Sequence, residues 1–341
     1  RHHGDREATP GLIDFAVNVF DGPRPAWLDT ALAAADVSRY PDAAPATAAI
    51  AERHGRHLDE VLPTAGAAEA FGLVARLRRW RHPLVVHPQF TEPDVALAAA
   101  GHRPHHLVLR STDGFALDPT AVGSDADLVV VGNPTNPTGV RHPADVLRAL
   151  VAPGRLVVVD EAFLDDGAES LAVGPLDGLL VIRSLTKLWS IPGVRAGYLL
   201  AGAELVGELA DLQTPWSVSA AANAALVACS SAEATAEAER RVARIADERQ
   251  FLQAGLAKLA IPYVAGSTAP FVLAQPGPGV HAALRDAGFA VRRADTFPGL
   301  DPSWVRIAVR NQQVTTSLLD ALECIHQARG SRWESGTVAL L

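Results

Sequence analysis

Sulfur-containing residues and metal-binding spacings are sparse in this sequence of 341 residues. Methionine is absent, and the two cysteines, Cys229 and Cys324, lie in separate helix-like stretches. Isolated thiols of this kind are more typical of inert buried side chains than of a disulfide, and no CxxC pair is present. The 12 histidines are scattered without an HExxH or comparable spacing, so the sequence predicts no metal site.

Long apolar runs and excess positive charge are also missing. No stretch reaches the ~18 consecutive apolar residues of a membrane helix. The formal net charge is −8, whereas nucleic-acid binding requires clustered lysine and arginine. The first residues are charged and lack the apolar segment of a secretory signal. We therefore expect a cytoplasmic globular protein that binds neither nucleic acid nor membranes.

Short apolar runs alternate with helical periodicity between residues 60 and 200. The runs are continuous, which is typical of strands buried on both faces of a mostly parallel sheet. Helices between such strands predict a three-layer α/β fold whose ligands gather at the carboxyl ends of the strands. The expected strands are residues 84–86, 107–109, 128–131, 156–159, 179–182 and 198–200, with a helix over residues 67–80.

The chain is long enough for two domains, because one core rarely grows beyond ~250–300 residues. We assign residues 36–230 to a large α/β domain and residues 231–341 to a smaller α+β domain. Residues 1–35 form an N-terminal arm that contributes to the smaller domain. Within the smaller domain we expect a long helix over residues 231–260, strands at 271–273, 289–291 and 304–309, and a final helix over residues 315–327.

The most informative stretch follows an apolar run that is expected to be a strand. It places Lys187 beside the hydroxyls of Ser184 and Thr186, with Arg195 shortly after. A lysine at the end of a buried strand is costly unless its ammonium is neutralised or used. Two hydroxyls and an arginine suit a phosphate dianion. An amine beside a phosphate site is what a pyridoxal phosphate (PLP) enzyme requires, although a surface turn can carry the same residues.

Three further features lie at the ends of expected strands or the start of a helix. Residues 133–139, Asn-Pro-Thr-Asn-Pro-Thr-Gly, follow one strand, and Asp160 closes the next. Residues 66–68 open the helix expected from residue 67. Each feature alone has an ordinary explanation as a turn, a cap or a helix start. Their occurrence in this order, with Lys187 after the aspartate, is much harder to obtain by chance.

With these motifs the chain resembles the fold-type I PLP enzymes of the aspartate aminotransferase superfamily. The similarity covers nearly the whole chain, up to Arg310. Within the superfamily the chain looks closest to histidinol-phosphate aminotransferases and to the related threonine-phosphate decarboxylases and aminotransferase-like proteins of cobalamin synthesis. The resemblance implies a large α/β/α domain with a mostly parallel sheet, a smaller α+β C-terminal domain, and a homodimer with shared active sites.

The resemblance assigns the central chemistry to Lys187 and Asp160. It implies that Lys187 is the Schiff-base lysine and shuttles protons at the α-carbon of the substrate. Asp160 pairs with the pyridine nitrogen and keeps the ring an electron sink. Asn136 binds the ring oxygen, and Phe90 stacks on the ring.

The resemblance also implies how the phosphate of the cofactor is bound. Ser184, Thr186 and Arg195 bind it together with the backbone N–H groups of Ala67 and Ala68. A helix start suits a dianion because its free N–H groups and its dipole point at the ligand.

Tyr40 matches the tyrosine that reaches the phosphate of the neighbouring subunit in these enzymes, although an ordinary turn aromatic also explains it. Arg306 matches the arginine that holds the carboxylate of the substrate, because its planar fork forms two parallel hydrogen bonds. Arg310 and Asn18 are weaker candidates for substrate contact. The His-His-Gly segment at residues 2–4 is weaker still.

Two departures from the family pattern affect these expectations. Phe163 stands where many aminotransferases have a tyrosine that donates to the ring oxygen, so Asn136 acts there without that partner. Losing one donor should raise the pKa of the cofactor–lysine adduct. Ala67 and Ala68 replace polar side chains that often assist the phosphate, which leaves the backbone amides to bind it.

Three functions remain open. We expect an aminotransferase that acts on a small phosphorylated amine or amino acid, with an oxo-acid such as 2-oxoglutarate as acceptor. The alternative is an O-phosphothreonine decarboxylase of cobalamin biosynthesis. It is favoured by residues 2–4, Phe163, residues 215–218, and the pair Arg306 and Arg310. The two activities differ in which bond at the α-carbon stands perpendicular to the ring. A non-catalytic binding protein is less consistent, because Lys187 and Asp160 are both present.

Overall fold

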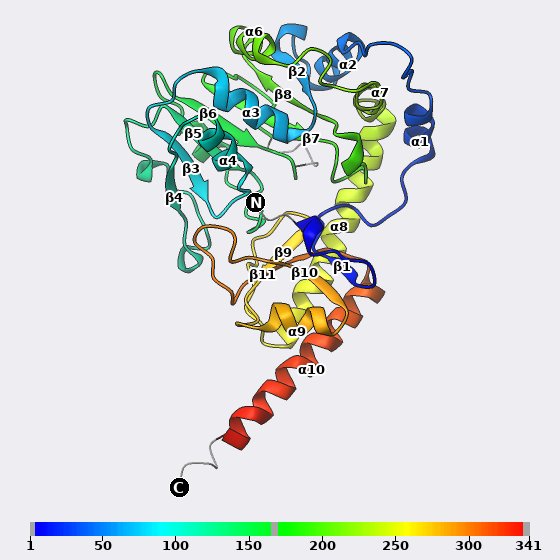
Figure 1. The fold of residues 1–341 in the computed structure, drawn as a ribbon, viewed down its shortest axis with the longest axis vertical. Helices are drawn as coiled ribbons and strands as arrows, with labels where there is room; N and C mark the ends of the chain where they lie inside the picture. The colour runs from blue at the N-terminus through cyan, green and yellow to red at the C-terminus, as the bar shows by residue number, and fades with distance from the viewer. Residues whose placement is uncertain (1–3, 165–169, 337–341) are drawn as a thin grey trace.

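The computed structural model describes residues 4–164 and 170–336, with side chains described up to residue 328. Two β-sheets make up the molecule, and the long helix α8 runs from one to the other (Figure 1). The candidate residues His2 and His3 lie outside the described ranges. Within these ranges, no helix is long and apolar enough to cross a membrane.

The larger sheet has seven strands in the order β2-β8-β7-β6-β5-β3-β4. Strands β7, β6, β5, β3 and β4 pair in parallel, whereas β8 pairs antiparallel with both β7 and β2. Val129 and Val131 point into the core on one face, and Leu128 and Val130 into the core on the other, which explains the continuous apolar runs. The strands are β2 (Val61–Thr64), β3 (Pro83–His87), β4 (His105–Val108), β5 (Leu128–Gly132), β6 (Leu156–Asp160), β7 (Leu179–Ser184) and β8 (Gly197–Ala201).

Helices cover both faces of this sheet. Helices α1, α2, α5, α7 and the first half of α8 pack on one face, and α3, α4 and α6 pack on the other. The predicted three-layer α/β/α architecture is therefore confirmed. The helices are α1 (Ala26–Ala33), α2 (Ala44–His54), α3 (Ala67–Leu77), α4 (Glu92–Ala99), α5 (Ala144–Arg148), α6 (Ala203–Leu212), α7 (Ala220–Cys229) and α8 (Ala232–Lys258).

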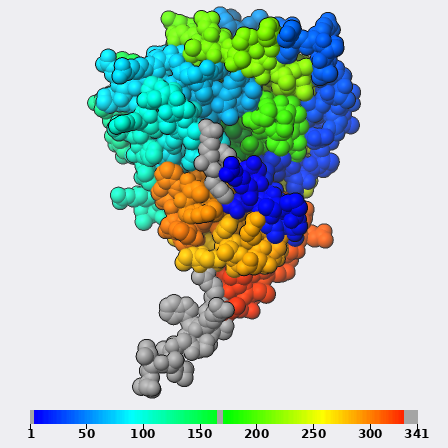
Figure 2. Space-filling view, viewed as in Figure 1, coloured from blue at the N-terminus to red at the C-terminus, as the bar shows by residue number. Residues whose placement is uncertain are grey.

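The smaller sheet combines the two ends of the chain in the order β1-β10-β11-β9. Strand β1 pairs in parallel with β10, so the N-terminal segment, blue in Figure 2, lies against the orange and yellow part of the molecule. The second half of α8, together with α9 and α10, packs on this sheet through side chains such as Leu252 and Leu318. These elements are β1 (Ile13–Phe15), β9 (Phe271–Ala274), α9 (Val280–Asp286), β10 (Phe289–Arg293), β11 (Val305–Ala308) and α10 (Gln312–Gly336).

Some element boundaries differ from those expected. Helix α3 ends at Leu77 and not at residue 80, because Arg78 adopts an extended backbone conformation. Strand β4 begins two residues before the expected run, at His105. Strand β2 is not among the strands expected from the sequence. It contains Pro63, which cannot donate to a neighbouring strand and is tolerated at the edge of the sheet. The domain boundaries at residues 35 and 230 stay predictions.

Candidate active site

A cavity of about 640 Å³ lies where the carboxyl ends of β6 and β7 face the smaller sheet. Parallel strands bring residues from distant parts of the chain to this edge, which is where open α/β sheets bind ligands. A cavity of this size suits a cofactor or small substrate. Its lining includes the predicted residues Asn18, Ala67, Ala68, Phe90, Asn136, Asp160, Ser184, Thr186, Lys187, Arg195 and Arg306.

Lys187 lies in the loop after β7, and its side chain faces the cavity. The backbone N–H of Phe20 donates to the Lys187 carbonyl at 3.0 Å, which ties this loop to the N-terminal segment. Burial lowers the pKa of the Lys187 amine to about 8, and the positive charges of Arg195 and Arg306 act in the same direction. A useful fraction of this amine is therefore neutral, and so nucleophilic, near physiological pH.

Asp160 is the last residue of β6 and faces the same cavity. Burial raises the pKa of its carboxyl to about 6. The backbone N–H of Ala162, which donates to Oδ1 at 3.0 Å, and the charge of Lys187 oppose this rise, whereas Glu161 adds to it. Both reactive groups thus have pKa values displaced toward neutrality.

One end of the cavity is built to hold an anion. The hydroxyls of Ser184 and Thr186 are 2.8 Å apart, and Arg195 lies at the same end. Gly66 precedes α3 with a φ of 76°, and a Cβ there would come within 2.6 Å of Arg195 Nη2. A glycine is therefore required both by the backbone and by the position of the guanidinium. The first N–H groups of α3, at Ala67 and the following residue, open onto the same space.

Arg306 crosses from the smaller sheet to the large one. It is 5% exposed, and its guanidinium donates to Asn136 Oδ1 at 2.5 Å and to the Ala16 carbonyl at 2.6 Å. With its amide oriented to present oxygen, Asn18 accepts from Arg306 Nη1 at 3.0 Å. Burial lowers the Arg306 pKa to about 9, which still leaves it charged at neutral pH. Asn136, Asn18 and Arg306 thus form one polar cluster.

Arg292 was not identified from the sequence, yet it lines the cavity beside Arg306. The two residues are partners in the β10–β11 register, and Arg292 is 3% exposed. It donates to Thr296 Oγ1 at 2.7 Å, and its guanidinium lies 4.9 Å from the ring centre of Phe297. Burial lowers its pKa to about 10. Only the pairing of two strands that are separated in sequence brings the second arginine to the site.

The N-terminal segment also reaches the cavity. Gly4, Asp5 and Arg6 contribute to its lining. A Cβ on Gly4 would lie 2.5 Å from the Ala16 carbonyl oxygen and 3.3 Å from Arg306 Nη2, so only glycine fits there. Gly4 is a weak candidate from the sequence alone, whereas Asp5 and Arg6 have no sequence signal that points to the cavity.

Aromatic side chains form the apolar walls. Phe90 and Phe163 line the cavity with Phe297. Phe163 packs edge-on against Phe271 with ring centres 5.0 Å apart. Phe163 therefore presents an apolar ring, with no hydroxyl, to the cavity.

Tyr40 does not line the cavity of its own chain. Its side chain is 76% exposed and stacks on Trp216 with ring centres 4.4 Å apart. Its predicted contact with the phosphate of a neighbouring subunit stays a prediction.

Arg310, a predicted substrate contact, is directed at the backbone instead of the cavity. Its guanidinium donates to the carbonyl oxygens of Asp14 at 2.8 Å and of Val17 at 2.7 Å. It also bonds the carbonyls of Val19 and Val309. These contacts give Arg310 a positioning role, because they hold the segment that presents Asn18. The sequence does not show that Arg310 binds these carbonyl groups, because most of them belong to residues far from it in the chain.

Comparison with known proteins agrees with this geometry. Residues 10–322 match the family described as aminotransferase class I and II. A histidinol-phosphate aminotransferase of Mycobacterium tuberculosis is 46% identical over 91% of this chain and 87% of its own length. A threonine-phosphate decarboxylase of Salmonella typhimurium is more distant, at 29% identity over 91% of this chain and 90% of its own length.

Solved structures show the same fold. The histidinol-phosphate aminotransferase of Clostridium acetobutylicum superposes with a TM-score of 0.83 at 24% identity, covering 93% of this chain and all (100%) of that one. The L-threonine-O-3-phosphate decarboxylase of Porphyromonas gingivalis gives 0.80 at 23% identity, covering 91% of this chain and 98% of that one. The family match, the identity to curated relatives and the fold lead to one conclusion: this chain belongs to the class I and II aminotransferases.

Proposed function

We propose that this chain is a PLP-dependent aminotransferase that acts on histidinol phosphate or a closely similar phosphorylated amine, with an oxo-acid such as 2-oxoglutarate as acceptor. The observation that supports this most directly is one cavity with a partly neutral lysine on one side and two buried arginines on the other. A reaction at the amino group of an anionic substrate needs both parts: a neutral amine for the chemistry and fixed positive charges that bind the anion. The 46% identity to a histidinol-phosphate aminotransferase supports the same substrate class.

The described residues fit PLP. The space above Gly66 that a Cβ would fill, the paired hydroxyls of Ser184 and Thr186, and Arg195 match a phosphate dianion. Asp160 lines the same cavity and could accept a hydrogen bond from a protonated ring nitrogen, and Phe90 could stack on the ring. When bound, PLP supplies an aldehyde for amines and a ring that withdraws electrons.

We assign the proton transfers to Lys187. Its lowered pKa lets the amine accept a proton from the α-carbon of the substrate and return it at another position. Asp160 would hold the protonated ring nitrogen of the bound cofactor, and as a carboxylate it would favour the positive charge there. Arg306 and Arg292 orient the anionic substrate, because each guanidinium offers a planar pair of donors.

The proposal includes a homodimer and a cytoplasmic location. Tyr40 and Trp216 are exposed and stacked outside the cavity, which suits a contact between subunits. Mixing a Lys187→Ala chain with a Tyr40→Ala chain tests the shared site. Hybrid dimers should recover activity that neither parent has, because one of their two sites is intact. Absence of recovery in proven hybrids would rule out the contribution of Tyr40 across the interface.

The decarboxylase of cobalamin biosynthesis remains the second candidate, and Phe163 is the observation that favours it. A direct test supplies the purified holoenzyme with histidinol phosphate and 2-oxoglutarate, and separately with phosphothreonine. We expect glutamate formation from the first pair. Carbon dioxide from phosphothreonine without amino transfer to the acceptor would reverse the order of the two candidates. The Lys187→Ala variant is the blank for both assays.

A further inference from the structure

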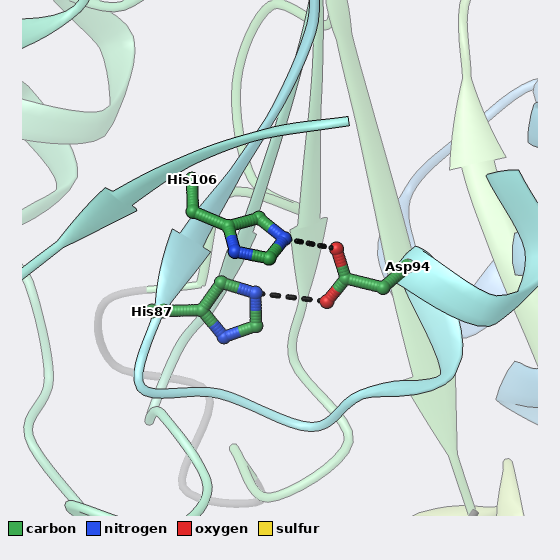
Figure 3. A group of neighbouring side chains, drawn as sticks. All are labelled: His87, Asp94 and His106. Atoms are coloured by element: carbon green, nitrogen blue, oxygen red, sulfur yellow. Dashed lines mark hydrogen bonds and ion pairs between the residues drawn. The ribbon is translucent and has the colours of Figure 1, made fainter. Parts of the chain in front are cut away.

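A cluster of two histidines and one aspartate lies behind the cavity wall, at the edge of the large sheet (Figure 3). His87 ends β3, His106 lies on the neighbouring edge strand β4, and Asp94 lies in the first turn of α4. Strands β3 and β4 pair Val85 with His106, so His87 and His106 lie on the same face of the sheet. Helix α4 covers that face and brings Asp94 to both imidazoles.

The three side chains converge on one point. Asp94 Oδ2 lies 2.8 Å from His87 Nε2, and Asp94 Oδ1 lies 2.8 Å from His106 Nε2. The two rings are 4.4 Å apart between centres, at 64° to each other. One ligand atom from each residue lies within 4.8 Å of the other two. A zinc ion ~2.0–2.2 Å from each ligand atom requires these atoms to lie within ~4.4 Å of one another, so small side-chain shifts are needed to complete the set.

His87 makes this cluster more than a surface ion pair. Its side chain is fully buried (0% exposed), whereas that of His106 is 39% exposed. Among the described residues, the polar contact of His87 Nε2 is with Asp94 Oδ2, and although this contact is short, it is not directed as a regular hydrogen bond. A buried imidazole nitrogen without a well-directed bond is costly. A metal ion would satisfy it, and the exposed edge of His106 gives the ion a path of entry.

We propose that His87, Asp94 and His106 bind a divalent transition-metal ion of the zinc class, with water at the remaining coordination position. Two imidazoles and one carboxylate are a ligand set that such ions accept. None of the three residues is among those that line the cavity, so the ion is outside the reaction site. It cross-links β3, β4 and α4, and thereby the short connection that carries Phe90 into the cavity.

Coordination changes the proton arrangement on His87. Nε2 must offer its lone pair, so the proton of the neutral ring moves to Nδ1. Without the ion, His87 Nδ1 accepts a hydrogen bond from the backbone N–H of Gln89 at 3.4 Å. This bond breaks when the ion binds, because Nδ1 then carries the proton. A hydrogen bond of that length is weak, so its loss costs little against a metal–imidazole bond.

The test is a zinc titration of the EDTA-treated holoenzyme in competition with a chromophoric chelator. His106→Ala and Asp94→Asn each remove one ligand, and we expect them to weaken zinc binding by roughly 10- to 100-fold or more. His105→Ala is the matched control. His105 is the adjacent residue on β4, points to the opposite face and stacks on His82, so its loss should leave zinc affinity within about threefold.

Three outcomes would overturn the proposal. The wild-type chain binds no zinc, its affinity is unchanged in both ligand variants, or all three variants lose it equally. A second measurement is independent of variant folding: X-ray absorption of the wild-type zinc complex. It should show two nitrogen ligands and at least one oxygen ligand at ~2.0–2.2 Å, and a set of surface histidines without oxygen would contradict the assignment.

Discussion

Lys187 and Asp160, at the ends of strands in the large sheet, face Arg292 and Arg306 on two paired strands of the smaller sheet. Burial acts on all four groups, with different results. It displaces the pKa of Lys187 to about 8 and that of Asp160 to about 6, so both titrate near neutral pH. The pKa values of the arginines fall only to about 10 and about 9, so both remain charged.

The comparison separates reaction from recognition. The reactive wall of the cavity, formed by Lys187 and Asp160, changes charge near neutral pH and can exchange protons. The charged wall, formed by Arg292 and Arg306, keeps its charge and can only attract and orient the substrate. Intrinsic pKa values decide the difference, because a lysine and an aspartic acid start closer to neutrality than a guanidinium does. Substitutions on the two walls should therefore affect different kinetic constants.

The largest effect is expected from Lys187→Ala. Loss of the amine should reduce kcat by ~10²–10⁴-fold or more, because it removes the group assigned to proton transfer. The chain offers a natural control, since lysine occurs only at positions 187 and 258 and Lys258 is exposed at the end of α8. Lys258→Ala should keep full activity. Borohydride reduction of the holoenzyme followed by peptide mass mapping should label position 187 alone, and labelling at 258 would contradict the assignment.

Arg306→Lys and Arg292→Lys probe the charged wall. Each keeps the charge but loses the planar fork, so KM for the phosphorylated substrate should rise by about 10–100-fold, from one charged hydrogen bond, while kcat changes less. Steady-state kinetics with the substrate and with its dephosphorylated analogue measures this. If the substitutions raise KM for the dephosphorylated analogue as much as for the substrate, the arginines do not recognise the phosphate. A fall in kcat as large as the rise in KM would show that the arginines also act in the reaction, and would contradict the separate roles of the two walls.

The pH dependence of cofactor uptake sharpens the comparison. Only the neutral amine of Lys187 adds to an aldehyde, and its pKa is lowered from 10.5 to about 8. The uptake rate of the apo form should therefore rise about tenfold per pH unit below pH 8 and level off above it. Stopped-flow absorbance between about pH 6 and about pH 10 measures this, because each limit is about two units from the expected pKa. A rate still rising steeply at the upper limit would show an ordinary lysine.

The smallest effect is expected from Gly66→Ala. The added Cβ meets Arg195 Nη2 at 2.6 Å, and the φ of 76° is unfavourable for alanine. We expect a loss of about 1 kcal/mol or more in the free energy of unfolding. Affinity for PLP should fall several-fold, because Arg195 must move. Thermal melting and cofactor titration measure both, with Gly72→Ala on α3, where a Cβ meets no atom within 4 Å, as control.

The reactive wall could be predicted from sequence because its geometry follows from the strands. Asp160 comes directly after a continuous apolar run, and Lys187 and Asn136 lie in the loops that follow two others. Parallel strands bring such positions to one edge of the sheet. The family resemblance then assigned their roles. In the same way, both buried faces of the large sheet could be inferred from apolar runs alone.

The rest depends on pairings that leave no local trace. Arg292 reaches the cavity through the register of β10 with β11, and Arg310 is held by carbonyl groups nearly a full chain length away. The sequence predicted no metal site because metal spacings are recognised within one element. His87, Asp94 and His106 come from three elements, and only the packed sheet brings them together.

Strand β1 has a consequence for the order of events during synthesis. It leaves the ribosome well before its partner β10 and before Arg310, whose guanidinium holds the residues that follow β1. Residues 14–19, which supply Asn18 to the cavity, cannot adopt their final conformation until β10 and Arg310 have been made. The large sheet can fold while translation continues, since domains generally form as they emerge. The cavity, with Asn18 in place, is therefore complete only after β10 and Arg310 have been made.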